Sequence, residues 1–287
     1  MKRILAFGAG RVAKPCIQYL LQKEDYEVFL VDKVRENLDI TLSGRERGHP
    51  VTEDAYENAG RLMDEYKPDV VLCLLPAAMN SRIARECIQR SIDMTAASYA
   101  KEEIRNLSEE AEAKGVTLLF EMGLDPGIDH MSASRTIKKI HDEKGEVISF
   151  WSVCGSLPEA SSNNNPYGYK LSWAPSSVVD SSKREAKIIK DKKVIVMPDG
   201  ETYLHPSLVE IKGLGWFEEY ANGDSTPYIQ AYDMPEVKDV YRGTLRYLGW
   251  SETVNALLRL GLYESSKIDL SNMTYSDLIR KLTDIDT

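Results

Sequence analysis

The chain has 287 residues, enough for two domains, and its 43% hydrophobic and 28% charged residues are ordinary for a globular protein with a buried core. Its formal net charge is −9, and the basic residues are interleaved with acids, which argues against binding a nucleic-acid backbone. No apolar run is long enough to span a bilayer. We therefore expect neither nucleic acid nor a membrane as a partner.

The cysteine pattern bears on metal binding and on the cellular compartment. Cys16, Cys73, Cys87 and Cys154 lie far apart and form no CxxC pair, which argues against a structural zinc site and against a disulfide framework. The short apolar stretch after Met1 runs directly into glycines, so it reads as a first strand rather than a signal peptide. We expect no metal site and a cytoplasmic location.

Strand-like and helix-like segments alternate over the first part of the chain. The strand-like segments are short apolar runs at residues 3–7, 26–32, 69–75, 92–98 and 116–122. Between them, apolar residues recur with helical spacing at residues 12–21, 55–66, 83–88 and 104–113. Gly115 follows the last of these helices as its C-cap. This alternation predicts an α/β fold, a Rossmann-type doubly wound parallel sheet over residues 1–122.

The pattern changes after this first domain. In chain order, a helix, a strand, a polar loop and another strand are predicted at residues 128–141, 147–154, 161–169 and 193–197. Further strand-like pieces, separated by turns, continue to residue 247. We therefore predict a second, α+β substrate-binding domain with a mixed sheet over residues 123–250, followed by a helical segment over residues 251–287.

The stretch GAGRVAKP, residues 8–15, lies between the first strand and the first helix. Gly8 permits a tight turn, Gly10 lets a pyrophosphate approach the backbone, and Ala13 is small enough for close packing of helix on strand. A helix N-terminus also offers unpaired N–H groups and a partial positive charge to a phosphate. The alternative is a structural turn without a ligand. We expect a dinucleotide to bind at Gly8, Gly10, Arg11, Val12 and Ala13.

Asp32 ends the second predicted strand, 22 residues after Gly10, close to the ~20 typical of the dinucleotide fingerprint. A carboxylate there can accept hydrogen bonds from both ribose hydroxyls of NAD and repels the 2′-phosphate of NADP. Lys33 and Arg35 lie close enough to weaken that discrimination. The sequence favours NAD, with NADP as the alternative cofactor.

Three stretches of the second half are more specific than composition explains. They read EMGLDPGIDHM, CGSLPEASSNNNPYGYKLSW and RGTLRYLGW, at residues 121–131, 154–173 and 242–250. Three shorter stretches accompany them: GAGRVAKP, TAASYA and GDSTPY, at residues 8–15, 95–100 and 223–228. In this order the motifs resemble the saccharopine dehydrogenase family, especially the glutamate-forming saccharopine reductases of lysine metabolism. The resemblance extends to about residue 262.

The resemblance implies a Rossmann domain with a mixed-sheet substrate domain, a homodimer, and NAD(P)-dependent hydride transfer at a CH–NH bond. Saccharopine would be oxidised to an imine, which water splits into glutamate and aminoadipate semialdehyde, or the reverse would occur. A carboxynorspermidine-type dehydrogenase of polyamine conjugates is an enzymatic alternative. A non-catalytic dinucleotide-binding scaffold is the alternative from another class.

Three residues are predicted to be catalytic on this resemblance: Tyr99, Asp125 and Cys154. Tyr99 follows the fifth predicted strand and Asp125 the sixth, at the edge where open α/β sheets bind ligands. Asp125 is also placed to cap the helix beginning near Pro126, and Cys154 is also typical of a small core residue that ends a strand. These alternatives stay open.

Further contacts are expected from the same motifs. Cofactor contacts are predicted at Leu75, Ser98 and Pro126. Substrate contacts are predicted at Tyr99, Asp125, Asn165, Thr244 and Arg246, the last two as carboxylate clamps. Three further residues lie in these motifs: Lys170 and Trp173 share the loop of Asn165, and Arg242 either binds a carboxylate or pairs structurally. His130 is a possible base, but a helical histidine without a catalytic role is the more economical interpretation.

Two departures limit the comparison. Related sequences typically read Arg-Asp-Ser-Thr where this chain reads Gly223-Asp-Ser-Thr, so an arginine expected to grip a substrate carboxylate is missing. This departure favours a related amine or amino acid over saccharopine itself as the substrate. The family also usually returns to the Rossmann domain after the helical segment, and we expect that return to be absent from this chain.

Overall fold

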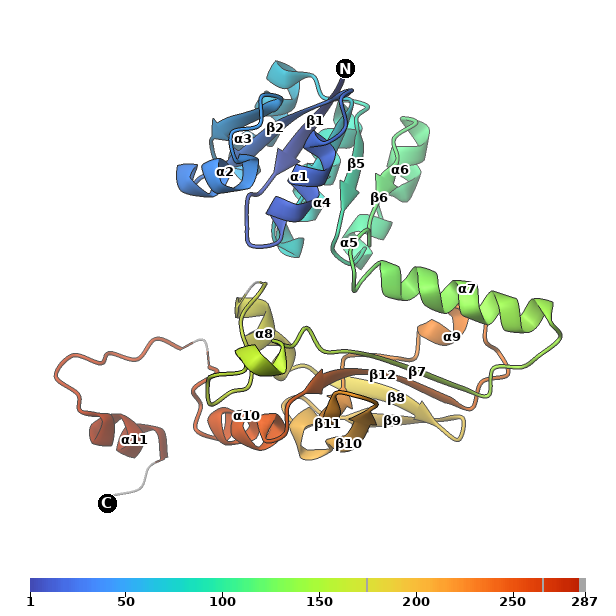
Figure 1. Cartoon of the computed structure of the whole chain (residues 1–287), viewed down its shortest axis with the longest axis vertical. Coiled ribbons are helices and arrows are strands. Elements are labelled where there is room, and N and C mark those ends of the chain that lie inside the picture. Colours follow the sequence, from blue (N-terminus) through green and yellow to red (C-terminus); the bar gives the residue numbers. More distant parts are fainter. Residues whose placement is uncertain (174, 265, 284–287) are drawn as a thin grey trace. The chain divides into compact units, whose positions relative to one another are not determined.

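The computed structural model describes residues 1–173, 175–264 and 266–283. The chain forms two compact units, Met1–Ser134 and Arg135–Thr287, each of which is described by itself (Figure 1). The finer division at residues 122 and 250 stays a prediction. No helix among the described residues combines the length and the apolar character needed to cross a membrane.

The first unit is built on a parallel sheet of six strands with the order β3-β2-β1-β4-β5-β6. This is the strand order of a Rossmann fold, so the predicted fold is confirmed. Its strands are β1 (Lys2–Phe7), β2 (Tyr26–Asp32), β3 (Gly48–Thr52), β4 (Val70–Cys73), β5 (Asp93–Ala96) and β6 (Leu118–Leu119). Its helices are α1 (Ala13–Leu21), α2 (Arg35–Leu42), α3 (Ala55–Tyr66), the short 3₁₀ helix η1 (Ala77–Met79), α4 (Asn80–Gln89), α5 (Glu102–Arg105) and α6 (Ser108–Ala113).

Helices cover both faces of this sheet. Successive strand residues point to opposite faces, and in β1 Leu5 and Phe7 join one apolar cluster whereas Ile4 and Ala6 join another. The first cluster includes buried residues of α3 and α4, and the second includes buried residues of α1 and α2. A strand buried on both faces explains the continuous apolar runs of the sequence.

Three local predictions differ from the structure. Helix α2 and strand β3 were not predicted, because α2 is rich in polar residues and β3 holds Pro50, a residue confined to edge strands such as this one. The single helix predicted over residues 104–113 is two helices, and near the break the Ser108 hydroxyl donates to the carbonyl of Arg105. The strand predicted over 116–122 pairs only at Leu118–Leu119.

The second unit is built on a mixed sheet of six strands. Strand β12 pairs in parallel with β7 and antiparallel with β11 and β8, which confirms the predicted mixed sheet. Its strands are β7 (Ser149–Cys154), β8 (Ala186–Lys190), β9 (Lys193–Met197), β10 (Ser207–Ile211), β11 (Gly215–Ala221) and β12 (Asp239–Arg246). The helices of this part are α7 (Ile128–Asp142), which begins in the first unit, η2 (Ala160–Ser162), α8 (Pro175–Ser182), η3 (Thr202–Leu204), α9 (Tyr228–Ala231), α10 (Trp250–Arg259) and α11 (Tyr275–Thr283).

Candidate functional site

The loop between β1 and α1 has the shape expected of a phosphate cradle. Gly8 has φ +99°, and a methyl group there would lie 3.1 Å from the backbone carbonyl carbon and oxygen of Leu74, so both conformation and space require glycine. A methyl group at Gly10 would meet no atom of the protein within 4 Å. Packing within the chain therefore does not demand Gly10, whereas close approach of a ligand to the backbone would.

The start of α1 suits an anion. Its N-cap is Val12, which offers no side-chain hydrogen bond, and the first turn contains no acidic residue. The N-terminal N–H groups and the helix dipole are therefore not screened by a capping side chain or an acid. Ala13 is fully buried against the sheet, while Val12 is 58% exposed beside the loop. The residues of this chain fit a dinucleotide pyrophosphate.

Asp32 links the loop to the second strand. Its Oδ2 accepts a hydrogen bond from the backbone N–H of Ala9 at 2.8 Å, and its Oδ1 accepts one from that of Val34 at 2.9 Å. A carboxylate has about four lone-pair sites, so both oxygens can still accept from ribose hydroxyls. The sequence predicted the ribose contact; the bond to Ala9, which positions the glycine loop, was not predicted.

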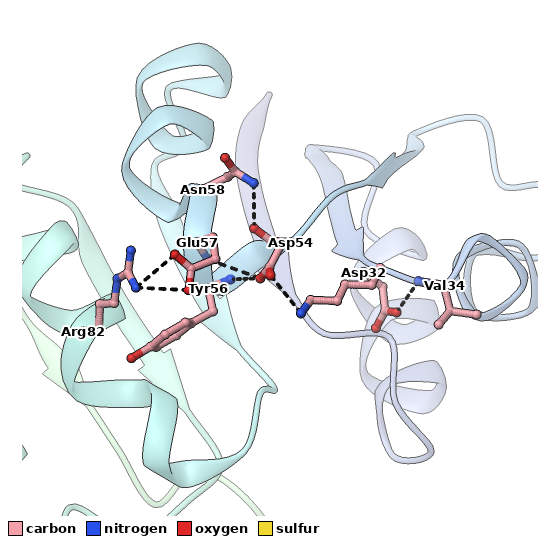
Figure 2. A network of polar contacts seen from close by, with 8 residues as sticks. Asp32, Val34, Asp54, Tyr56, Glu57, Asn58 and Arg82 are labelled. Carbon is pink, nitrogen blue, oxygen red and sulfur yellow. Dashed lines mark hydrogen bonds and ion pairs between the residues drawn. The ribbon is translucent and has the colours of Figure 1, made fainter.

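A network of charged groups lies beside Asp32 (Figure 2). Lys33 Nζ lies 2.8 Å from Asp54 Oδ2, and Asp54 also caps α3 by accepting from the backbone N–H groups of Tyr56 and Glu57. The hydrogen bond to Asp54 raises the pKa of Lys33, and the same bond lowers the pKa of Asp54. Lys33 is thus already engaged by a carboxylate of the same unit.

Arg35, the other nearby cation, pairs with Asp39 at 2.9 Å along α2. Lys33 and Arg35, which were expected to weaken the discrimination of Asp32 against NADP, therefore both have carboxylate partners.

A buried polar chain crosses the carboxyl ends of β4 and β5. The Cys73 thiol donates to Asn80 Oδ1 at 3.1 Å, and Asn80 Nδ2 donates to the Ser98 hydroxyl at 2.5 Å. Burial raises the pKa of Cys73 to about 11, so the thiol keeps its proton and acts as the donor. Asn80 is 1% exposed and was not singled out from the sequence, where a polar residue at a helix start carries no distinctive signal. Leu75 follows this edge and packs partly on the core.

Tyr99 and Asp125, predicted from separate motifs, are in contact. The Tyr99 hydroxyl donates to Asp125 Oδ1 at 2.8 Å. The ring of Tyr99 also meets that of His130 edge to face at 6.1 Å between centroids. Asp125 is followed by Pro126, joined through a cis peptide bond. The structure thus brings together two of the three predicted catalytic side chains.

An acidic side chain in the first turn of α7 accepts a hydrogen bond from the backbone just before the helix. Gly127 donates its backbone N–H to Asp129 Oδ1 at 2.7 Å. His130 Nε2 lies 3.8 Å from Asp129 Oδ2 and 3.8 Å from Glu121 Oε2, and its side chain is 18% exposed. Two acids of its own neighbourhood thus lie close to His130, which suits the structural interpretation of this histidine.

The second sheet carries the other predicted residues on one face. Cys154 of β7 and Thr244 of β12 are register partners, and Arg246 is two residues further along β12, on the same face. The guanidinium of Arg246 stacks on the rings of Tyr169 and Trp250, at 4.6 and 4.9 Å from their centroids. Cys154, Thr244 and Arg246 therefore share one surface of this unit.

Arg246 is 5% exposed and its contacts are not with acids. Its Nη1 donates to the carbonyls of Gly155 and Leu245 at 2.7 and 2.8 Å, and its Nε has no partner among the described residues. A buried cation is costly without a counter-charge. The arrangement suits an anionic ligand.

Other predicted contacts have roles within the fold. Asn165 donates to the carbonyl of Tyr169 and accepts from the N–H of Tyr167, so its amide shapes its own loop. Trp173 Nε1 donates to the Tyr169 hydroxyl at 2.8 Å, which supports the ring that Arg246 stacks on. Lys170, beside them in the loop, is exposed.

Arg242 stacks on the ring of Tyr228 and also donates to its hydroxyl. Its backbone N–H donates to the hydroxyl of Ser225 at 3.0 Å. These contacts favour the structural interpretation of Arg242.

Comparison with known proteins matches both units. The family model "Saccharopine dehydrogenase NADP binding domain" matches residues 4–119, and "Saccharopine dehydrogenase C-terminal domain" matches residues 123–285. The first of these names and those of two fungal relatives specify NADP, so the predicted preference for NAD has no support from them.

Individual relatives cover most of this chain. It is 30% identical over 267 residues to saccharopine dehydrogenase [NADP(+), L-glutamate-forming] of Pyricularia oryzae, a match that spans 91% of this chain and 58% of the relative. It is 30% identical to mitochondrial alpha-aminoadipic semialdehyde synthase of Bos taurus, over 99% of this chain and 31% of the relative. The apo saccharopine dehydrogenase (L-Glu forming) of Saccharomyces cerevisiae superposes with a TM-score of 0.86 and 29% identity, over 98% of this chain and 64% of that one. The chain thus spans less than two thirds of these proteins, and it belongs to the saccharopine dehydrogenase family.

Proposed function

We propose that the chain is an NAD(P)-dependent oxidoreductase that acts at the CH–NH bond of a secondary amine derived from amino acids. Saccharopine is the first candidate substrate, oxidised in the presence of water to glutamate and aminoadipate semialdehyde, or formed from them by the reverse reaction. The observation that carries the proposal is the open cradle at Gly10, bounded by an uncapped helix start and by Asp32. The names of the relatives support the substrate class.

The first unit would hold the dinucleotide. Backbone N–H groups at the start of α1 would bind the pyrophosphate, and Asp32 would accept from the ribose hydroxyls. Leu75, Ser98 and Pro126 would line the nicotinamide half along the carboxyl edge of the sheet. When bound, the nicotinamide supplies the acceptor or donor of the hydride.

Tyr99 and Asp125 would manage protons on the substrate amine and on water. The Tyr99 hydroxyl donates to Asp125 Oδ1, a bond that helps to hold this carboxylate in place. Fixing a carboxylate in one rotamer is what general acid–base catalysis requires. We assign Asp125 the proton-transfer role and Tyr99 the positioning of that carboxylate.

Arg246 and Thr244 would bind a substrate carboxylate on the face of the second sheet. Arg246 is buried and forms no ion pair with the described residues, and this provides the electrostatic reason, since an anionic ligand would supply a counter-charge. Cys154, the register partner of Thr244, would lie beside this carboxylate, and Asn165 would support the loop next to it.

We further propose that NAD is preferred over NADP, although the relatives compared are named for NADP(+). The support is the charge around the ribose position. Asp32 is a carboxylate, Lys33 is engaged by Asp54, and Arg35 is engaged by Asp39. A 2′-phosphate would face an acid and would have to draw a lysine away from its partner.

A homodimer and a cytoplasmic location complete the proposal. All four cysteines are free thiols, and Cys73 and Cys87 are buried, which suits a reducing compartment. Light scattering of the purified chain tests the dimer.

The proposed function is tested with the purified chain, saccharopine and either dinucleotide. We expect the absorbance of reduced nicotinamide to rise only when the chain, saccharopine and a dinucleotide are all present. Tight binding of a dinucleotide without turnover of saccharopine would instead support a scaffold. Failure of both dinucleotides to bind would contradict the redox function itself.

A further inference from the structure

Gly223 and Arg184, 39 positions apart in the sequence, lie against each other in the second unit. Gly223 follows β11 with φ +68°, and a methyl group there would lie 3.6 Å from Cζ of Arg184 and 3.7 Å from its Nε and Nη2. Backbone bonds hold the two segments together, since Lys187 donates its N–H to the carbonyl of Gly223 at 3.0 Å. The guanidinium of Arg184 thus lies next to position 223, where the positive φ favours glycine.

The acids next to Arg184 are engaged elsewhere. Glu185 and Asp224 lie 2.9 and 3.9 Å from Nζ of Lys187, and the hydrogen bond with Glu185 raises the pKa of Lys187. Arg184 itself donates from Nη2 to the side-chain oxygen of Asn222 at 2.6 Å. Within the described ranges, no carboxylate lies within ion-pair distance of Arg184. An exposed guanidinium thus stands beside two acids without pairing with either.

Asn222 places this guanidinium on the face of the proposed carboxylate site. The backbone N–H of Asn222 donates to the carbonyl of Arg242 at 2.9 Å, so the pairing of β11 with β12 extends to it. Side chains alternate along a strand, so Asn222 shares a face with Tyr220, whose register partner is Thr244. Arg184 therefore reaches the face that carries Thr244 and Arg246.

We propose that Arg184 binds a second carboxylate of the substrate, through the guanidinium edge that Asn222 leaves open; this proposal rests on the proposed function. Guanidinium binds a carboxylate through two parallel N–H donors. Arg184, in the segment before β8, would then take the role of the arginine that is absent at position 223. The substrate class that follows is an amino-acid conjugate with carboxylates on both arms, such as saccharopine, rather than a polyamine conjugate.

Titration of saccharopine into the dinucleotide-saturated chain tests the proposal. Arg184→Gln is expected to weaken saccharopine binding about 10- to 100-fold, because hydrogen bonds to a charged group are lost, while dinucleotide affinity stays unchanged. Arg184→Lys keeps the charge without the fork and is expected to fall in between. Lys190→Gln, which removes one positive charge from an exposed position of β8, is the matched control and is expected to bind saccharopine as the unsubstituted chain does.

Equal saccharopine affinity of Arg184→Gln and the unsubstituted chain would overturn the proposal, and so would an equal loss in Lys190→Gln. If the unsubstituted chain binds a dinucleotide but not saccharopine, the substrate assignment of the proposed function fails as well.

Discussion

Glu218 and Arg246 stand opposite each other on β11 and β12, yet their side chains bind different partners. The Glu218 carboxylate accepts from the backbone N–H groups of Gly249 and Ser251 at 2.5 and 2.8 Å, which caps the start of α10. The Arg246 guanidinium instead stacks between aromatic rings. The Glu218 carboxylate, opposite Arg246 in the sheet, is thus bound to backbone N–H groups rather than to the guanidinium.

The first prediction concerns this cap. Glu218→Gln weakens two charge-assisted bonds to backbone N–H groups, one part-buried and one buried, and we expect the free energy of unfolding to fall by about 1–3 kcal/mol. Urea unfolding followed by circular dichroism measures it. Glu252→Gln, an exposed acid in the first turn of α10, is the control and should change stability by less than about 0.5 kcal/mol. A stability equal to that of the unsubstituted chain would show that Glu218 does not cap α10 in solution.

The second prediction concerns the choice of dinucleotide. Asp54→Asn keeps an N-cap on α3, because asparagine caps as well as aspartate, but removes the carboxylate that holds Lys33. We expect NADP to bind about two- to fivefold more tightly relative to NAD, the range that an exposed ion pair can account for. Asp32→Ala should shift the ratio further in the same direction by weakening NAD about tenfold.

Fluorescence titration of both dinucleotides measures these ratios. Asp64→Asn breaks a comparable pair with Arg90 (2.7 Å) at the other end of α3 and should leave the ratio unchanged. If Asp54→Asn leaves the ratio of NADP affinity to NAD affinity unchanged, the ion pair with Asp54 does not keep Lys33 from binding the 2′-phosphate.

The third prediction tests whether Asn80 positions Ser98. Since the Ser98 hydroxyl accepts from Asn80, its own proton is directed toward other acceptors. We expect Ser98→Ala and Asn80→Ala each to weaken dinucleotide binding about fivefold. The double variant should bind as tightly as the weaker-binding single variant, because the effects of residues in one hydrogen-bond network do not add. A double-mutant cycle on dinucleotide affinity measures the coupling. Additive losses would argue that the two residues act independently.

The fourth prediction concerns acid stability. The backbone N–H of Val147 and the side chain of His141 donate to Glu236, and these bonds lower its pKa from 4.5 to about 2. A depressed pKa in the folded state stabilises the protein above pH 4.5, and this contribution is lost as the pH falls toward 2. In Glu236→Gln we expect a flatter dependence of unfolding free energy on pH within that window. An unchanged slope in urea unfolding between pH 5 and pH 2 would argue against the assigned bonds.

Local sequence signals predicted the glycine loop but not the residues that are placed by contacts between distant segments. The glycines, the helix start and Asp32 follow a spacing that needs only one strand, one turn and one helix. Asn80 bonds to Ser98 and Arg184 bonds to Asn222, contacts between separate segments that single-sequence periodicity does not reveal. The pairing of Tyr99 with Asp125 was predictable in part: different motifs placed both residues at the same sheet edge, but not the hydrogen bond between them. The fold class followed from the buried strands, whereas α2 and β3 lacked an apolar pattern of their own.

The last prediction separates a catalytic Asp125 from a structural one. Asp125→Asn can still accept from Tyr99 but cannot exchange a proton, so we expect kcat with saccharopine to fall about 10²- to 10⁴-fold while dinucleotide affinity changes little. Tyr99→Phe removes only the positioning bond and should lower kcat by a smaller factor. Asp142→Asn, an exposed acid of α7 paired with Lys138 at 3.0 Å, is the control and should leave kcat unchanged. A kcat that survives Asp125→Asn, with a lower free energy of unfolding, would assign Asp125 to the start of α7 instead.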